Sequence, residues 1–174
     1  MRIGTVLRLG VVAAFGLVAG VSAQVVAERE RVLAEGRIVL FELAPVDPRS
    51  LMQGDYMALR FAIDDALPRR EGGGPLPRFA YLAVDAEGRA RLAGVGEALP
   101  APSAAVAVAV RVRMRDGAPS VGPNAFFFQE GRAEVFAQAR WGEFRVAADG
   151  TALLTHLRDE GLQRLGTPAR AGVL

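Results

Sequence analysis

The chain has 174 residues, of which 51% are hydrophobic and 23% are charged, which is enough apolar material for one folded core and too much for a disordered polypeptide. It contains no cysteine, and all 21 of its basic residues are arginine. This composition excludes disulfides, thiolate nucleophiles, zinc–cysteine sites, Schiff-base lysines, serine–lysine dyads and Walker-type phosphate lysines. We expect one folded domain that depends on packing alone.

An apolar run near the N-terminus indicates whether the protein is attached to a membrane. Residues 9–27 contain no charged side chain, and the charged residues 28–31 follow them directly. A helix over this run would be about 28 Å long, close to the thickness of the hydrocarbon core of a bilayer. The favoured interpretation is an uncleaved transmembrane anchor. The alternatives are a signal peptide cleaved after Ala23, because Val21 and Ala23 fit the small-residue pattern, and a buried core helix of a soluble protein.

The distribution of charged residues predicts on which side of the membrane the rest of the chain lies. Arg2 and Arg8 precede the apolar run, which favours a cytoplasmic N-terminus and a domain on the far side of the membrane. From Glu28 onward the chain has 19 basic and 19 acidic residues, so this part is formally neutral. No basic patch is clustered on one element, and we therefore expect no nucleic-acid partner.

The predicted organisation has five parts. They are a cytoplasmic N-terminus (1–8), a transmembrane anchor or signal peptide (9–27), a helical stem (28–36), an extracytoplasmic β-rich domain (37–165) and a flexible tail (166–174). The stem is expected to end at Gly36, because glycine is a common C-terminal stop of helices.

The body of the chain has the alternation typical of short strands. Strands are predicted over 38–43, 56–63, 106–114 and 124–128, and hairpins over 79–95 and 143–157 with acidic-glycine turns at Asp85–Gly88 and Asp149–Gly150. One helix is predicted over 132–141, where Phe136 and Trp141 belong to one apolar face. About seven strands predict a mainly β fold, a small barrel or sandwich with one short covering helix.

A family resemblance appears at the second strand. The run Gly54-Asp55-Tyr56-Met57-Ala58-Leu59-Arg60-Phe61 resembles the signature of the bacterial GDYXXLXY family, with phenylalanine where that signature ends in tyrosine. The segments 45–50 and 128–131 and the final hairpin also resemble the family, so the resemblance extends from about residue 33 to residue 157. It implies a membrane-anchored bacterial protein, often encoded with polytopic membrane proteins, and it carries no defined activity. The localisation expected from it is the inner membrane, single-pass, with the C-terminal domain in the periplasm.

The motif also has a physical interpretation of its own. Gly54 and Asp55 suit a tight turn into a strand. Leu59 and Phe61 then share one face and point into the core, whereas Tyr56 has the opposite parity and lies at the rim or on the other face. A turn followed by a core strand is the favoured interpretation, and a binding role is the alternative.

Three adjacent phenylalanines, 126–128, must project alternately to opposite faces of a strand. We expect the helix with Phe136 and Trp141 to cover them, and an external partner is the alternative. The candidate binding residues, from the motif and its rim, are Asp47, Arg49, Gly54, Asp55, Tyr56, Leu59, Phe61, Phe127 and Glu130.

Catalytic and metal chemistry receive little support. Ser50 precedes a Gly-Asp strand, as the nucleophile does in the signal-peptidase fold, but the chain has no lysine to act as its base. His156 is the single histidine and is expected to be a hydrogen-bonded structural residue. Nothing in the spacing of Asp47, Asp55, Glu130 and Glu134 requires a metal site, and Glu130 is expected near a helix N-terminus. We expect no cofactor and no metal.

The sequence therefore predicts a membrane-anchored extracytoplasmic binding or assembly module, not an enzyme. Its expected partners are the membrane, through the anchor, and another membrane or envelope protein. Two alternatives stay open: a lysine-independent hydrolase that uses Ser50 with a carboxylate or His156, and a small-ligand carrier with an apolar barrel interior.

Overall fold

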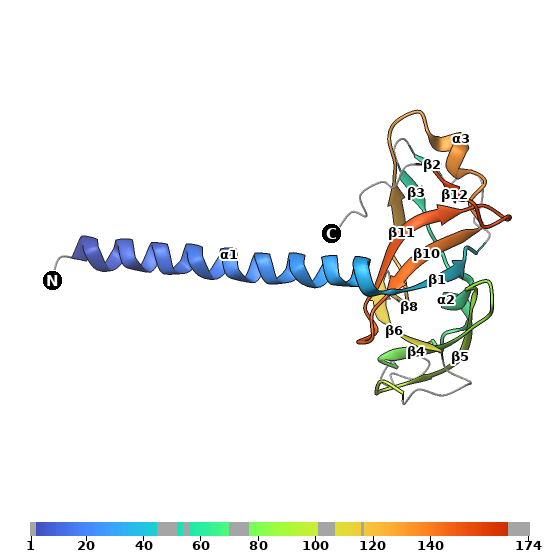
Figure 1. Cartoon of the computed structure of the whole chain (residues 1–174), viewed down its shortest axis with the longest axis horizontal. Coiled ribbons are helices and arrows are strands. Elements are labelled where there is room, and N and C mark those ends of the chain that lie inside the picture. The colour runs from blue at the N-terminus through green and yellow to red at the C-terminus, as the bar shows by residue number, and fades with distance from the viewer. Residues whose placement is uncertain are drawn as a thin grey trace.

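The computed structural model describes residues 3–44, 52–53, 56–69, 77–100, 107–115 and 117–166. In this part of the chain a long helix, α1 (Ile3–Glu35), leads directly into a mainly β domain (Figure 1). The predicted anchor and stem form this one continuous helix. It ends as predicted before Gly36, whose N–H donates to the carbonyl of Val32 at 2.9 Å.

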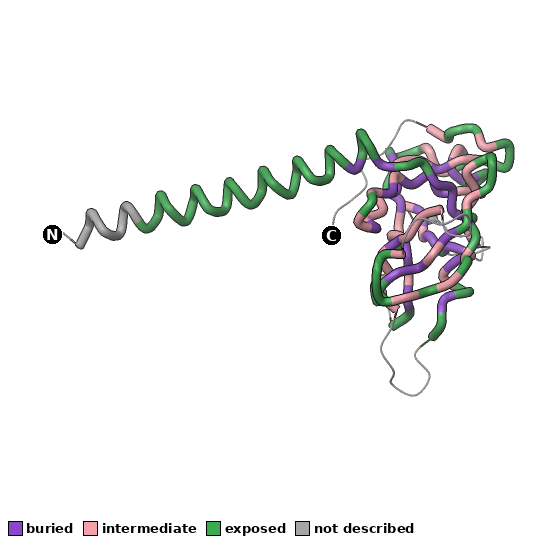
Figure 2. The backbone as a smooth tube through the Cα atoms, turned by 60° about the horizontal axis from the view of Figure 1, so that its bottom comes forward, coloured by how far each residue is buried: buried purple, intermediate pink, exposed green. Residues whose placement is uncertain are grey.

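α1 projects from the domain as a rod, and its surface is exposed along nearly all of its described length (Figure 2). The span Gly10–Glu35 is long and apolar enough to cross a membrane, with a mean hydropathy of 2.0 in its most apolar window, none of which is buried. Phe15 and Leu17, for example, are 77% and 70% exposed. The alternative of a buried core helix is therefore wrong.

The largest sheet has four antiparallel strands in the order β1-β10-β11-β12. They are β1 (Arg37–Glu42), β10 (Trp141–Val146), β11 (Ala152–Arg158) and β12 (Arg164–Leu165). Its inner face carries the apolar side chains of Val39, Phe41, Phe144, Leu154 and Leu157, all buried. This burial on one face explains the alternation of the two long strands of the final hairpin.

The other described strands form smaller antiparallel sheets. One has the order β5-β4-β6, with β4 (Phe79–Val84), β5 (Ala90–Gly96) and β6 (Val108–Arg111). Another has the order β2-β3-β9, with β2 (Met52–Gln53), β3 (Tyr56–Ala58) and β9 (Ala125–Phe127), and a third pairs β7 (Arg113–Arg115) with β8 (Ala118–Ser120). The described residues also include two short helices, α2 (Ala62–Ala66) and α3 (Ala133–Phe136).

Together the sheets curl around one core (Figure 1). Backbone hydrogen bonds join them, from the N–H of Leu40 to the carbonyl of Gly88 at 2.8 Å and from the N–H of Arg111 to the carbonyl of Gly150 at 2.9 Å. The mainly β prediction is confirmed. The closed barrel or sandwich of seven strands is not, because the described strands form a curled half-barrel in which several strands are only two or three residues long.

Both predicted hairpins are present. β4 and β5 are joined by a turn in which Gly88 has a φ of 86°, and β10 and β11 by a turn in which Gly150 has the same φ. Residues with a side chain rarely adopt this left-handed conformation, so the glycine in each acidic turn is required by the backbone.

Three predicted elements differ from the structure. The strand over 56–63 stops at Ala58, and Ile63 lies in α2 with its side chain buried. The helix over 132–141 is the single turn α3, because Trp141 instead begins β10 and pairs with Glu42 and Arg158. The strand over 106–114 is interrupted at Val112, whose N–H donates to the carbonyl of Arg78.

Candidate functional site

The structure describes part of the predicted rim. Asp47, Arg49, Gly54 and Asp55 lie outside the described residues, as does Ser50. The other predicted binding residues, Tyr56, Leu59, Phe61, Phe127 and Glu130, are described.

Leu59 and Phe61 lie in the core, as their parity predicts, and are 5% and 0% exposed. The Phe61 ring meets Phe144 edge-on, with 5.3 Å between the ring centroids. It also lies against Gly122, where a Cβ would be 2.3 Å from the ring. These two motif residues therefore stabilise the fold and present no surface to a partner.

Tyr56 and Phe127 share the opposite face of the β2-β3-β9 sheet. They are direct partners in the antiparallel pairing of β3 with β9, and their ring centroids are 5.9 Å apart. Phe127 is 41% exposed and Tyr56 is half-buried. We call these two rings the aromatic pair. Large exposed aromatic rings are common at protein interfaces, so this pair is the described feature of the motif region that suits binding.

The neighbours of Phe127 explain why only this ring faces outward. Phe126 and Phe128 are buried and contact Phe136 of α3, with centroid distances of 5.2 and 5.0 Å. The predicted covering helix is therefore confirmed for Phe136. It is wrong for Trp141, which is a strand residue whose ring lies under the guanidinium of Arg89 at 5.4 Å.

Glu130 lies in the turn between β9 and α3 and is exposed. The N-cap of α3 is Arg132, and its side chain makes no capping hydrogen bond. Glu130 thus lies close to a helix N-terminus, as expected, but α3 is only one turn long and its N-terminus has no side-chain capping hydrogen bond.

Glu143 is a buried charged residue that the sequence analysis missed. It lies in β10 and is 0% exposed. Its Oε2 accepts from Nε of Arg158 at 2.7 Å and from Nε of Arg164 at 2.9 Å, and Oε1 accepts from Nη2 of Arg164 at 2.7 Å. Burial raises the pKa of this carboxyl, but the hydrogen bonds and charges of the two arginines outweigh burial, and the net pKa is lowered.

His156 lies across from Glu143 in β11, with Nδ1 3.5 Å from Oε1 of the carboxylate. Nδ1 is buried and has no hydrogen-bond partner within the described chain. The hydrogen bond expected for a structural histidine is therefore absent at this nitrogen in the part of the chain that the structure describes. Burial lowers the pKa of His156, as do Arg164 and Arg158, whereas Glu143 raises it. A neutral imidazole beside a carboxylate held by two arginines has the character of a structural cluster. Among the described residues, no three His, Asp or Glu side chains are arranged to hold a metal ion.

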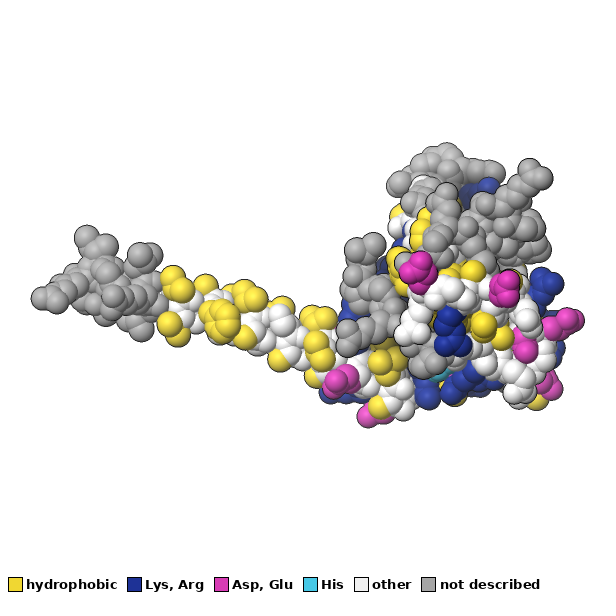
Figure 3. Space-filling view, turned by 90° about the horizontal axis from the view of Figure 1, so that it is seen from above, with side chains coloured by type: hydrophobic (Ala, Val, Ile, Leu, Met, Phe, Trp, Pro, Cys, Tyr) yellow, Lys and Arg dark blue, Asp and Glu magenta, His cyan; other side chains and the backbone are white. Residues whose placement is uncertain are grey.

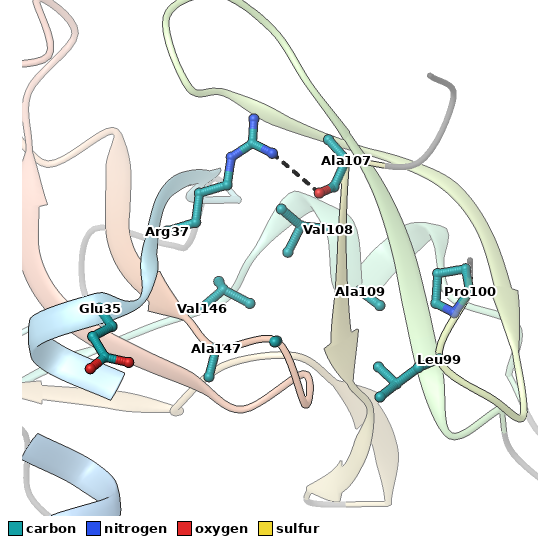
Figure 4. Close-up of a pocket in the computed structure, with 10 residues that line it drawn as sticks. Glu35, Arg37, Leu99, Pro100, Ala107, Val108, Ala109, Val146 and Ala147 are labelled. Atoms are coloured by element: carbon teal, nitrogen blue, oxygen red, sulfur yellow. Dashed lines mark hydrogen bonds between the residues drawn. The ribbon is translucent and has the colours of Figure 1, made fainter. Parts of the chain in front are cut away.

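A pocket of about 420 Å³ lies at the junction of α1 with the domain (Figure 4). Its walls are mostly apolar, and the Nη1 of Arg37 donates to the carbonyl of Ala107 at 3.2 Å along one side. The carrier hypothesis expects a cavity inside a barrel, and this pocket is instead between the end of α1, β6 and the turn after β10.

Figure 3 shows the apolar surface of α1 continuing toward the more mixed surface of the domain.

An exposed apolar helix followed by a mainly β domain is consistent with a single-pass membrane protein. The family model described as GDYXXLXY protein matches residues 18–157, which is most of the chain. The chain therefore belongs to the GDYXXLXY family, as its motif indicated. The search of curated proteins and the search of solved structures found no match.

Proposed function

We propose that this protein is a binding or assembly module anchored in the bacterial inner membrane, with its β domain in the periplasm and a membrane or envelope protein as its partner. The observation that carries the proposal is α1, whose described apolar side chains are exposed over the span that would lie in lipid. Exposed apolar surface of this length is costly in water and favourable in a bilayer.

The junction between α1 and the domain supports a partner close to the membrane. Val32 is only 5% exposed, and the Nη1 of Arg145 in β10 donates to the carbonyl of Gly36 at 3.0 Å. The helix thus runs into β1 without a flexible linker. Residues 28–35 would hold the domain about 12 Å beyond the apolar run, within reach of the outer loops of a membrane protein.

The aromatic pair supplies the proposed contact surface. Phe127 projects from a three-residue strand whose other face is buried, so the ring is exposed while its strand is packed against the core. An aromatic ring held rigidly in this way loses little conformational entropy when it is covered, which favours binding.

Two measurements on whole cells test the anchor and its orientation. The full chain should remain in the membrane pellet after alkaline carbonate extraction, whereas the Leu17→Arg/Val18→Arg double variant should be largely released. Because the natural chain has no cysteine, a single Glu160→Cys substitution should react with a membrane-impermeant maleimide from the periplasm, and Thr5→Cys should not. An intact wild-type chain in the soluble cytosol would contradict the proposal.

The contact surface is tested by purification from membranes after mild crosslinking. Wild-type chain is expected to retain one defined membrane or envelope protein, and Phe127→Ala to lose it. Val95→Ala is the matched control, since Val95 is an exposed apolar strand residue of β5, 37% exposed. Equal recovery of the partner with both variants would rule out the aromatic pair as the contact.

A further inference from the structure

Residues 159–166 fold back over the domain after β11, and we call this segment the strap. It turns at Leu162, which has a left-handed backbone with a φ of 63°, and returns as β12. The turn is closed by the N–H of Gln163, which donates to Oδ1 of Asp159 at 2.8 Å. The strap follows residues 18–157, the part that the family model matches.

Glu143 holds the strap at its first point of attachment. Arg164 of the strap makes a two-pronged contact with both carboxylate oxygens, and Arg158 binds the same carboxylate while its Nη1 donates to the carbonyl of Leu162 at 2.7 Å. A buried carboxylate is strongly destabilising without cationic partners. The strap therefore supplies one of the two cations on which Glu143 depends.

Phe136 provides the second point of attachment. Leu165 pairs with Leu157 and packs against the core, and Gly166 follows with a φ of 61°. A Cβ on Gly166 would lie 2.6 Å from Cζ of Phe136, so the backbone of the strap covers this ring directly. α3 is a single turn and depends on such tertiary contacts for its stability.

Contacts continue from α3 to the aromatic pair. Phe136 packs against Phe126 and Phe128, which flank Phe127 in sequence. β9 has only three residues and pairs with a strand of the same length, so its ladder alone is a weak restraint. The packing of Phe136 is consequently a main support of β9.

We propose that the strap is a latch, fastened by Glu143, which holds α3 and β9 in place and thereby orders the surface formed by Tyr56 and Phe127. Release of the strap uncovers Phe136 and loosens 125–128. The β5-β4-β6 sheet, at the opposite end of the domain from α3, stays folded (Figure 1). The latch is a property of the free chain and does not depend on a partner.

Hydrogen exchange of the full chain in detergent micelles tests the latch. Gly166→Ala forces a side chain against Phe136 without touching Glu143, and we expect exchange at 125–127 and 133–136 to rise about tenfold or more, with 79–96 unchanged. The control is Gly161→Ala in the same strap, where the nearest atom to a Cβ is Oδ1 of Asp159 at 3.4 Å and no increase is expected.

A second pair of variants acts at the other attachment. Glu143→Gln should raise exchange at 163–165 and at 125–127, and the control Glu42→Gln, an exposed residue of β1, should not. Arg164→Lys keeps the charge but loses the two-pronged contact, and a smaller increase at the same residues is expected if Glu143→Gln does not fold. Unchanged exchange at 125–127 in the folded latch variants would overturn the proposal, and so would an equal rise across all strands.

Discussion

Tyr56 and Phe127 face each other across β3 and β9, with their rings 5.9 Å apart on the outer side of a three-stranded sheet. The next pair along the ladder, Met57 and Phe126, is buried on the inner side. The described part of the family motif from Tyr56 to Ala58 is thus a short strand, with Met57 in the core and the half-buried Tyr56 on the outer face beside the more exposed Phe127.

Adjacent phenylalanines should therefore respond differently to truncation. Phe126→Ala is expected to lower the free energy of unfolding by about 3–5 kcal/mol, because it leaves a cavity against Phe136. Phe127→Ala removes a partly exposed ring and is expected to cost about 1 kcal/mol or less, most of it the cross-strand contact with Tyr56. Denaturant unfolding in micelles measures both. Similar losses would show that Phe127 is a core residue.

Gly36 should be intolerant of substitution. A Cβ at this position would lie 2.4 Å from the carbonyl oxygen of Val32 and 3.1 Å from Cβ of Arg145, so Gly36→Ala must displace the end of α1 from the sheet. The expected loss is about 1–3 kcal/mol of unfolding free energy. Gly94→Ala is the control, because its nearest contact is an ordinary 3.8 Å from the Tyr81 ring. Equal stability of the two variants would mean that α1 is not firmly docked.

The two carboxylates Glu143 and Asp65 provide a contrast between buried and exposed ion pairs. Glu143→Gln leaves two arginines around a neutral, buried group and is expected to cost about 3 kcal/mol or more. Asp65→Asn breaks an exposed pair with Arg60, and a change of about 1 kcal/mol or less is expected. Thermal and denaturant unfolding compare them. A small effect at Glu143 would argue against the ion cluster as a stabilising feature.

His156 makes stability depend on pH in the mildly acidic range. Burial and the two arginines lower its pKa in the folded chain below its ordinary value of 6.5, so the unfolded chain binds this proton more tightly. Stability is therefore expected to fall as the pH falls below about 6.5. The lowered pKa of Glu143 acts in the same direction, but in a more acidic range, below its ordinary value of 4.5. Unfolding midpoints between pH 7 and 5 should show a shallower dependence in His156→Gln, and an unchanged slope would contradict this origin.

Features that depend on local chemistry were predictable. The end of α1 at Gly36 and the two acidic-glycine hairpin turns follow from residues within a few positions of one another. The parity of Leu59, Phe61 and Tyr56 was also readable, because it depends only on alternation along a strand. The lengths of the elements were not, since residues such as Ile63 and Trp141 fit both a helical and a strand pattern, and long-range pairing decided between them.

Local sequence patterns predict only part of the candidate binding site. The sequence predicts that Phe126 and Phe127 point to opposite faces of a strand. It does not predict that Phe127 pairs with Tyr56. Register between distant strands depends on the packing of the whole core.

From composition and local pattern alone, the sequence determined a charge-balanced, cysteine-free domain on an apolar N-terminal segment, because hydrophobicity and turn preference are properties of neighbouring residues. Glu143 shows what only the tertiary structure decided. In the sequence it is one of 19 acidic residues, and nothing near it distinguishes it. It becomes a buried carboxylate because β11 and the strap bring Arg158 and Arg164 to it, and the electrostatic environment of a charge is set by whatever the folded chain places around it.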